Sequence, residues 1–180
     1  MKPEKVYVEY LLLKIRTGET GAWDQLLPIV QVKIRAMVGK TLGYSSGVDD
    51  CVQEAMLAIY RQVKRLKSVK AFHTWMYRIS YSKCMDFIRK QSPNHDFWEP
   101  SDDGMAVVDD QLDVQSAMAA LNERDKTIIY LFYAEGFKVS EIAAIMDQPA
   151  GTIKYHLFQA RAALKHQLED QKTPLTGESP

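Results

Sequence analysis

The chain has 180 residues, and 46% of them are hydrophobic, which is too much apolar content for a disordered chain and enough for one or two small cores. It has no run of about 18 or more apolar residues that could span a bilayer, and its first residues, MKPEKVYVEY, lack the apolar segment of a signal peptide. We therefore expect a soluble cytoplasmic protein that does not insert into a membrane.

Charge is distributed unevenly along the chain, although the formal net charge is zero. Residues 1–92 carry a net charge of +8, residues 93–114 carry −7, and residues 115–180 carry −1. The acidic segment also contains two prolines and a glycine and lacks apolar periodicity, which is typical of a connecting segment. We expect an all-α protein with two small helical domains, at residues 1–92 and 115–170, a flexible acidic linker at 93–114 and a disordered tail at 171–180.

The first strongly periodic segment runs from Trp23 to Leu42, where apolar residues recur every three or four positions. This spacing predicts an amphipathic helix that faces a core. Pro28 lies inside the pattern, and because proline removes one helical hydrogen bond, we expect a kink or a new helix start there. The next helix is expected to begin at a cap formed by Ser46, with Asp49 three residues later.

That next helix has two chemically different faces. One carries an apolar stripe that is expected to be buried, formed by Val48, Val52, Ala55, Ile59 and Val63. The other face carries Asp50, Gln53, Glu54 and Leu57. Such a face is usually only solvated, but polar groups around one large aliphatic side chain also suit a docking surface for another protein. The spacing alone leaves both interpretations open.

Residues 64–90 interleave cations with aromatic residues. Cations attract the phosphate backbone and aromatic faces accept unstacked bases, so the segment suits single-stranded nucleic acid. The alternative is a core stripe made of Phe72, Trp75, Met76 and Ile79, with the cations on a solvated face. We expect Trp75 and Ile79 to lie in the core, and backbone contacts from Lys67, Lys70, Arg78 and Lys83.

Residues 141–160, EIAAIMDQPAGTIKYHLFQA, predict two short helices joined by an abrupt corner. Asp147 can adopt the left-handed backbone conformation at the corner, and Pro149 suits the first position of the second helix. This pattern predicts a helix-turn-helix, whose second helix can enter the major groove. With one stripe buried, the residues expected to be exposed for contacts to bases or phosphates are Thr152, Lys154, Tyr155, His156 and Gln159.

Five segments occur in a characteristic order: LLLKIRTGETGAWDQLLP, VDDCVQEAMLAIYRQ, FHTWMYRISYSKCMDFIRK, the acidic linker, and ALNERDKTIIYLFYAEGFKVSEIAAIMDQPAGTIKYHLFQARAAL. Over about residues 8–170 the chain resembles the extracytoplasmic-function (ECF) sigma factors of the bacterial sigma-70 family. The resemblance implies a dissociable initiation subunit of RNA polymerase. Its N-terminal domain (region 2) would open the promoter at the -10 element, and its C-terminal domain (region 4) would bind the -35 element.

The resemblance also implies roles for residues, together with promoter DNA and a probable anti-sigma factor as partners. Docking on the clamp of the largest catalytic subunit of core RNA polymerase is implied for Asp50, Gln53, Glu54 and Leu57. Capture of the single-stranded -10 element is implied for Arg65, Lys67, Lys70, Phe72, His73, Arg78, Ser82 and Lys83. Binding of the -35 element is implied for Thr152, Lys154, Tyr155, His156, Phe158 and Gln159. Many relatives carry asparagine where Ser82 stands, which suggests a different base preference at the -10 element. Many also carry more cations at 154–159, which suggests a weaker grip on phosphate here or a different -35 sequence.

Other functional classes fit the sequence less well. A LuxR-like regulator would share the last 60 residues but would not need the VDDCVQEAM and FHTWMYRIS segments. An enzyme is disfavoured because no nucleophile–base or metal-ligand spacing links Cys51, Cys84, His73 and His95. We therefore expect no catalytic residues, cofactor, metal or small-molecule substrate, and we expect both cysteines to be buried, reduced thiols. A sigma-like decoy that binds a regulatory partner without initiating transcription stays open as an alternative.

Overall fold

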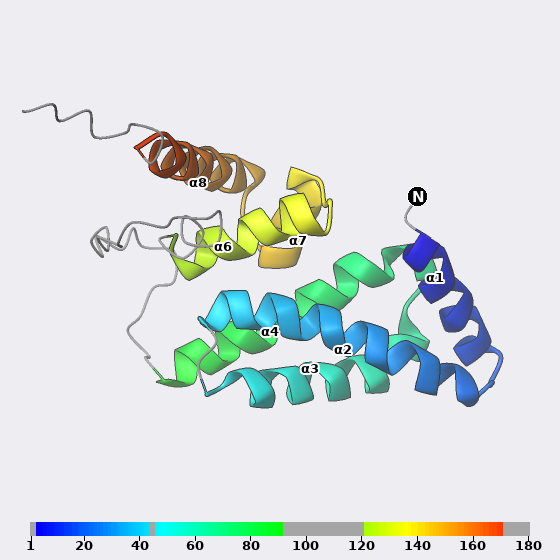
Figure 1. Cartoon of the computed structure of the whole chain (residues 1–180). Coiled ribbons are helices and arrows are strands. Elements are labelled where there is room, and N and C mark those ends of the chain that lie inside the picture. Colours follow the sequence, from blue (N-terminus) through cyan, green and yellow to red (C-terminus); the bar gives the residue numbers. More distant parts are fainter. Residues whose placement is uncertain (1–2, 44–45, 92–120, 171–180) are drawn as a thin grey trace, which may run out of the picture.

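A computed structural model describes residues 3–43, 46–91 and 121–170 of the chain (Figure 1). The predicted linker and tail lie outside these residues. Within them, all regular structure is helical, as predicted, and no helix is long and apolar enough to cross a membrane. The elements are α1 (Pro3–Arg16), α2 (Gly21–Leu42), α3 (Val48–Gln62), the 3-10 turns η1 (Val63–Arg65) and η2 (Val69–Ala71), α4 (Phe72–Gln91), α6 (Glu123–Ile129), the π-helical turn η3 (Tyr130–Ala134), α7 (Val139–Met146) and α8 (Ala150–Asp170).

The N-terminal helical group, α1 to α4, packs around the apolar stripes that the sequence predicted. The predicted stripe of α3 is buried along its whole length, and Leu26, Val30 and Ile34 of α2 are buried as well. Helix α2 continues through Pro28, so of the two expected alternatives, a kink or a new helix start, the new start does not occur. Pro28 has no N–H to donate to the Asp24 carbonyl four residues earlier. Asp24 and Pro28 are both exposed, so water can bond that carbonyl instead.

Helix α3 begins at Val48 rather than at a serine cap. Gly47 is the N-cap residue and no side chain caps it, so the predicted cap at Ser46 is wrong. A close helix–helix contact explains why this position is a glycine. Gly47 is buried, and a Cβ atom placed on it would lie 2.0 Å from Cζ of Phe87 on α4.

The C-terminal helical group contains the predicted helix-turn-helix. Asn122 caps α6 by accepting a hydrogen bond from the Asp125 amide at 2.8 Å. In η3 the Glu135 amide donates to the Tyr130 carbonyl five residues earlier, at 3.2 Å. Helix α7 ends at Asp147, which adopts the predicted left-handed conformation with φ 54° and ψ 47°. Helix α8 begins at Ala150, one residue later than expected from Pro149.

The two helical groups share one hydrophobic core. Helix α4 packs against α2 and α3 of its own group and against α7 of the other, and α6 packs on α2. Figure 1 shows α6 and α7 lying over α2 and α4, with α3 and α8 at opposite sides of the molecule. Cys51 and Cys84 are buried and unpaired by any disulfide, as the sequence predicted.

The contact between Gly47 and Phe87 makes a stability prediction. We expect Gly47→Ala to lower the free energy of unfolding by about 1–3 kcal/mol, the usual cost of overpacking a core. Chemical denaturation followed by circular dichroism measures the change. Gly21→Ala is the matched control, because a Cβ at Gly21 meets no atom within 4 Å. Equal stabilities of the two variants would contradict the packing argument.

Candidate protein and nucleic-acid interfaces

The outer face of α3 is exposed as the docking interpretation requires. Asp50, Gln53 and Glu54 are exposed, and the Leu57 side chain is 45% exposed although it is aliphatic. Tyr60, one turn after Leu57, is 53% exposed and packs its ring against Trp23 of α2 at a centroid distance of 4.7 Å. Tyr60 is not among the predicted docking residues, although its spacing of three from Leu57 places both on one face.

The basic segment forms an exposed bend between α3 and α4. Arg65, Lys67 and Lys70 are exposed on or next to the short turns η1 and η2. The guanidinium of Arg16, at the end of α1, donates a hydrogen bond to the Leu66 carbonyl in the middle of the bend. This contact fixes the bend against α1, and local sequence patterns do not predict it because the two residues are 50 positions apart.

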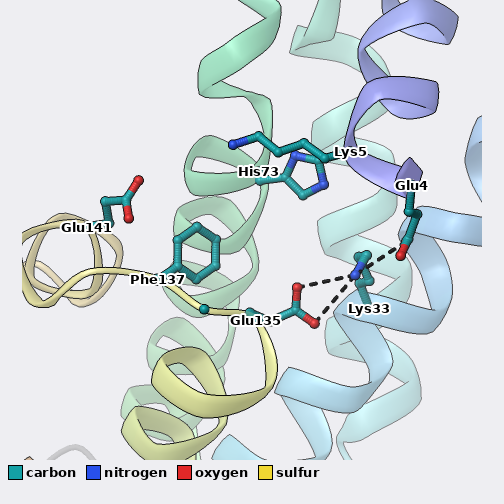
Figure 2. Close-up of a pocket in the computed structure, with 8 residues that line it drawn as sticks. Glu4, Lys5, Lys33, His73, Glu135, Phe137 and Glu141 are labelled. Atoms are coloured by element: carbon teal, nitrogen blue, oxygen red, sulfur yellow. Dashed lines mark hydrogen bonds and ion pairs between the residues drawn. The ribbon is translucent and has the colours of Figure 1, made fainter. Parts of the chain in front are cut away.

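Helix α4 separates the predicted single-strand contacts into two sets. Arg78 and Ser82 are exposed one turn apart, and Lys83 is half-buried, so these three are accessible. Phe72 is only 1% exposed and packs in the core, so its ring is not available to stack on a base. His73 is half-buried and lines a pocket of about 280 Å³ between the two helical groups (Figure 2).

The predicted polymerase-binding and single-strand-binding surfaces meet at one ion pair. The Lys83 ammonium on α4 lies 3.3 Å from the Glu54 carboxylate on α3. Both side chains are partly exposed, at 31% and 53%, so the pair contributes little to stability. It does place the two predicted surfaces next to each other on the N-terminal group.

Helix α8 presents an exposed aromatic and polar face. Lys154 and Gln159 are exposed, and Tyr155 and Phe158 are 58% and 70% exposed. The Gln159 amide donates to the Tyr155 hydroxyl at 3.0 Å, so the two side chains hold each other in one arrangement. Thr152 is half-buried at the first turn of the helix. The exposed residues can offer donors, acceptors and aromatic faces to a DNA groove.

His156 is the one residue of the predicted -35 set that the structure buries. Its side chain was expected to be exposed, but the residue is 8% exposed and its Nδ1 lies 3.1 Å from Oδ1 of Asp125 on α6. The same carboxylate accepts a hydrogen bond from the Asn122 amide at 3.1 Å. His156 therefore joins α8 to α6 and faces away from the exposed surface.

Burial sets the protonation of two histidines. The pKa of His156 is lowered from 6.5, first by desolvation and then by the Arg124 charge, while Asp125 acts in the opposite direction. The pKa of His73 is also lowered from 6.5, first by desolvation and then by the charges of Lys33 and Lys5. Both imidazoles are therefore neutral in the folded protein at pH 7.

Among the described residues, no group of three or more His, Cys, Asp or Glu side chains is placed to hold a metal ion. The pocket beside His73 is lined by charged residues of both signs, with Phe137 as its aromatic wall. The accessible candidate surfaces of the described chain are the outer face of α3, the bend between α3 and α4, the exposed side of α4 and the exposed face of α8.

Comparison with known proteins gives matches along most of the chain. A family model for Sigma-70 region 2 matches residues 29–93, and a model for Sigma-70 region 4 matches residues 111–164. The ECF RNA polymerase sigma factor SigW of Bacillus subtilis is 26% identical over 185 aligned residues, which cover 92% of this chain and 99% of that protein. The ECF RNA polymerase sigma-E factor of Escherichia coli K12 is 26% identical, with coverage of 92% and 96%.

Solved structures show the same fold. CnrH, in complex with the cytosolic domain of CnrY, is 20% identical and has a TM-score of 0.60, with coverage of 92% of this chain and 99% of CnrH. The sigma factor RpoE of Bartonella quintana, in complex with the anti-sigma factor NepR, is 23% identical and has a TM-score of 0.57, with coverage of 82% and 96%.

The lowered pKa values of His156 and His73 predict how stability depends on pH. A histidine whose folded pKa lies below its unfolded value of about 6.5 contributes stability that is complete above pH 6.5 and is lost as the pH falls toward the folded pKa. We therefore expect the free energy of unfolding to decrease between pH 7.5 and 5.5, as measured by urea denaturation.

His156→Gln and His73→Gln should each make that decrease smaller, because glutamine does not titrate. An equally steep decrease in the double variant would show that these histidines are not its source.

Proposed function

The chain belongs to the ECF group of the sigma-70 family, and from this premise we propose how its described surfaces act in transcription initiation. It is a sigma factor that binds core RNA polymerase, recognises a promoter and promotes strand opening. We propose that it acts in the cytoplasm and works by binding alone, without catalysis. The observation that carries the proposal is the match of regions 2 and 4, in order, on one chain.

We propose that the outer face of α3 docks on the clamp of the largest catalytic subunit of the polymerase. The exposed Leu57 and Tyr60, with Trp23 beside them, offer an apolar centre, and Asp50, Gln53 and Glu54 offer a polar rim. A compact apolar centre inside a polar rim is the usual composition of a protein interface.

Capture of the -10 single strand is proposed for the bend between α3 and α4 and for the exposed side of α4. Arg65, Lys67 and Lys70 lie on the bend, and Arg78, Ser82 and Lys83 follow on α4. Five of these six are lysine or arginine, so they suit contact with the sugar-phosphate backbone. Phe72 is assigned a supporting role from the core, because its ring is buried.

The -35 element is proposed to bind along α8. Lys154, Tyr155, Phe158 and Gln159 form the exposed face, and Thr152 lies near the helix start. His156 is not part of this proposed contact set. It is buried and joins α8 to α6 through Asp125. One helix of this size has too small an interface for selective binding, so the two DNA surfaces are expected to act together on the polymerase.

An anti-sigma factor is proposed as a further partner. The support comes from the two solved structures of similar fold, one of which contains the anti-sigma factor NepR and the other the cytosolic domain of CnrY. This proposal concerns the presence of such a partner and assigns it no residues of this chain.

Transcription in vitro tests the function directly. Purified chain and core polymerase are incubated with a pool of promoter fragments, and the start sites are sequenced. Initiation at fragments that share one pair of motifs supports the proposal. Binding to the polymerase without initiation at any fragment would favour the sigma-like decoy.

The docking surface predicts a specific effect of Leu57→Ser. Loss of an apolar residue at an interface centre commonly costs about 1–3 kcal/mol, so affinity for core polymerase should fall roughly tenfold or more. Val32→Ser is the matched control, because Val32 is a 71% exposed aliphatic residue of α2 outside the proposed surface. Fluorescence anisotropy of the labelled chain measures both. Equal affinities would contradict the assignment of α3.

The -35 surface predicts that Lys154→Ala combined with Gln159→Ala abolishes transcription from promoters that depend on the -35 element. Binding to core polymerase should be unchanged, because α3 is untouched. Lys165→Ala is the control for the loss of one cation from α8, since Lys165 lies more than two turns beyond Lys154. Retained -35-dependent transcription in the double variant would show that other residues contact the -35 element.

A further inference from the structure

Two cysteines lie buried in the contact between α3 and α4. They are the only cysteines of the chain, and Cys51 and Cys84 are 3% and 0% exposed. Neither belongs to a surface that the proposed function uses. Two buried thiols on adjacent helices can react with each other only if they face each other, so the register of α3 against α4 decides what this pair can do.

The close contact at the start of α3 defines one point of that register. A Cβ atom on Gly47 would lie 2.0 Å from Cζ of Phe87, so these two positions of α3 and α4 touch. Cys51 lies four residues after Gly47, and Cys84 lies three residues before Phe87. In an antiparallel pair of helices, one turn forward on the first helix meets one turn back on the second. The register therefore places Cys51 opposite Cys84.

Two further contacts confirm the antiparallel register. The Cys51 thiol donates a hydrogen bond to the Lys83 carbonyl at 3.8 Å, at the residue directly before Cys84. The Lys83 ammonium in turn lies 3.3 Å from the carboxylate of Glu54, which is three residues after Cys51 on α3. The Cys51 sulfur thus points at the backbone of α4 beside Cys84 and away from solvent.

The two thiols differ in acidity because they interact. The pKa of Cys51 is lowered from 9.0, first by its hydrogen bond with Cys84, whereas burial acts in the opposite direction. The pKa of Cys84 is raised, first by the same hydrogen bond and then by burial. Cys51 is therefore the thiol that ionises first, and the thiolate is the form that reacts with oxidants. Cys84 stays protonated beside it.

The start of α3 gives a small oxidant access to Cys51. Gly47 is the N-cap residue and no side chain caps the helix there. The first turn is closed by the hydrogen bond from the Cys51 amide to the Gly47 carbonyl, at 3.0 Å. The ends of helices open locally at little cost in free energy, and opening of this one turn exposes Cys51. Cys84 lies in the middle of α4 and stays covered.

We propose that Cys51 and Cys84 form an oxidisable dithiol, which hydrogen peroxide converts to a disulfide between α3 and α4, and that this disulfide lowers transcription initiation. The Cys51 thiolate attacks one peroxide oxygen, the O–O bond breaks and hydroxide leaves, which gives a sulfenic acid. The Cys84 thiol then attacks the sulfenic sulfur, the S–O bond breaks and water leaves. The two thiols together lose two electrons and two protons, and the peroxide is reduced to two molecules of water.

The disulfide acts where two proposed surfaces meet. Bonded sulfur atoms lie closer together than sulfur atoms in contact. Because α3 and α4 already touch at Gly47 and Phe87, closer approach at the cysteines shifts one helix relative to the other. Glu54 and Lys83 beside the cysteines belong to the proposed polymerase-binding and -10 surfaces. The effect on transcription rests on the proposed function, whereas the oxidation concerns the chain alone.

Oxidation of the full chain tests the dithiol. The reduced chain is treated with hydrogen peroxide, its remaining thiols are alkylated, and it is analysed by mass spectrometry without reductant. A monomer that has lost two hydrogen atoms, takes up no alkylating reagent and recovers both thiols in dithiothreitol would support the proposal. Sulfinic acid or disulfide-linked dimers as the main product would overturn it.

Ser80→Cys combined with Cys84→Ser is the matched control. Ser80 and Cys84 lie one turn apart on α4, and both are 0% exposed. The double variant therefore keeps the composition and two buried thiols but moves one thiol away from Cys51. Its disulfide should form at least roughly tenfold more slowly, because a disulfide requires a specific short separation. Equal rates in this variant and the natural chain would overturn the facing geometry.

Circular dichroism shows whether the double variant is folded. If it is not, Cys51→Ala serves in its place, because it removes the attacking thiol and leaves α4 unchanged. Cys51→Ala should give no monomer that has lost two hydrogen atoms. Such a product from this variant would show that the mass loss does not come from the cysteine pair, and would overturn the proposal.

Transcription in vitro tests the effect of the disulfide. The chain is oxidised, the peroxide is removed, and core polymerase is added without reductant. Transcription should fall below that of the reduced chain and return with dithiothreitol, whereas Cys84→Ser should be insensitive to the treatment. Equal transcription by the oxidised and reduced chains would overturn the inhibition but not the dithiol. If the reduced chain transcribes no fragment, the inhibition fails with the proposed function, and the mass measurement still decides the dithiol.

Discussion

The fold depends on the burial of α4 on several of its sides. Met76, Tyr77 and Cys84 are all fully enclosed, and the helix packs on α2 and α3 as well as on α7. Because close-packed side chains leave few alternative packings, the position of α4 fixes how the N-terminal and C-terminal groups lie relative to each other. The exposed strip of α4 that remains, with Arg78 and Ser82, is therefore fixed in direction by contacts on its other sides.

The same helix explains why the candidate surfaces lie close together on the N-terminal group. The outer face of α3 and the exposed strip of α4 belong to adjacent helices, and Lys83 and Glu54 connect them. A partner docked on α3, as proposed, would therefore lie beside the basic bend that is proposed to hold the DNA strand. Proximity of this kind lets binding energy from one contact support another that would be too weak alone.

Much of the fold, but less of the interfaces, follows from the sequence. Apolar periodicity identifies the buried stripes of α2, α3 and α8, because a helix buries a face that local spacing defines. The periodicity does not reveal which helix lies opposite. His156 sits on the expected helix, yet Asp125 of another helix buries it. Phe87 leaves room only for glycine at the N-cap of α3, and Lys33 meets Glu135 across 102 positions. These outcomes depend on tertiary contacts that local patterns do not encode.

The π-helical turn η3 sets the direction in which Glu135 points. Such a turn is a helix that accommodates one additional residue, and here it stacks Glu135 over Tyr130 through a bond spanning five positions. Because each helical residue advances the direction of the side chains by about 100°, loss of a single codon in this turn would rotate Glu135 away from α2. The length of residues 130–134 therefore decides whether the Glu135 carboxylate reaches the Lys33 ammonium, which lies 3.2 Å from it.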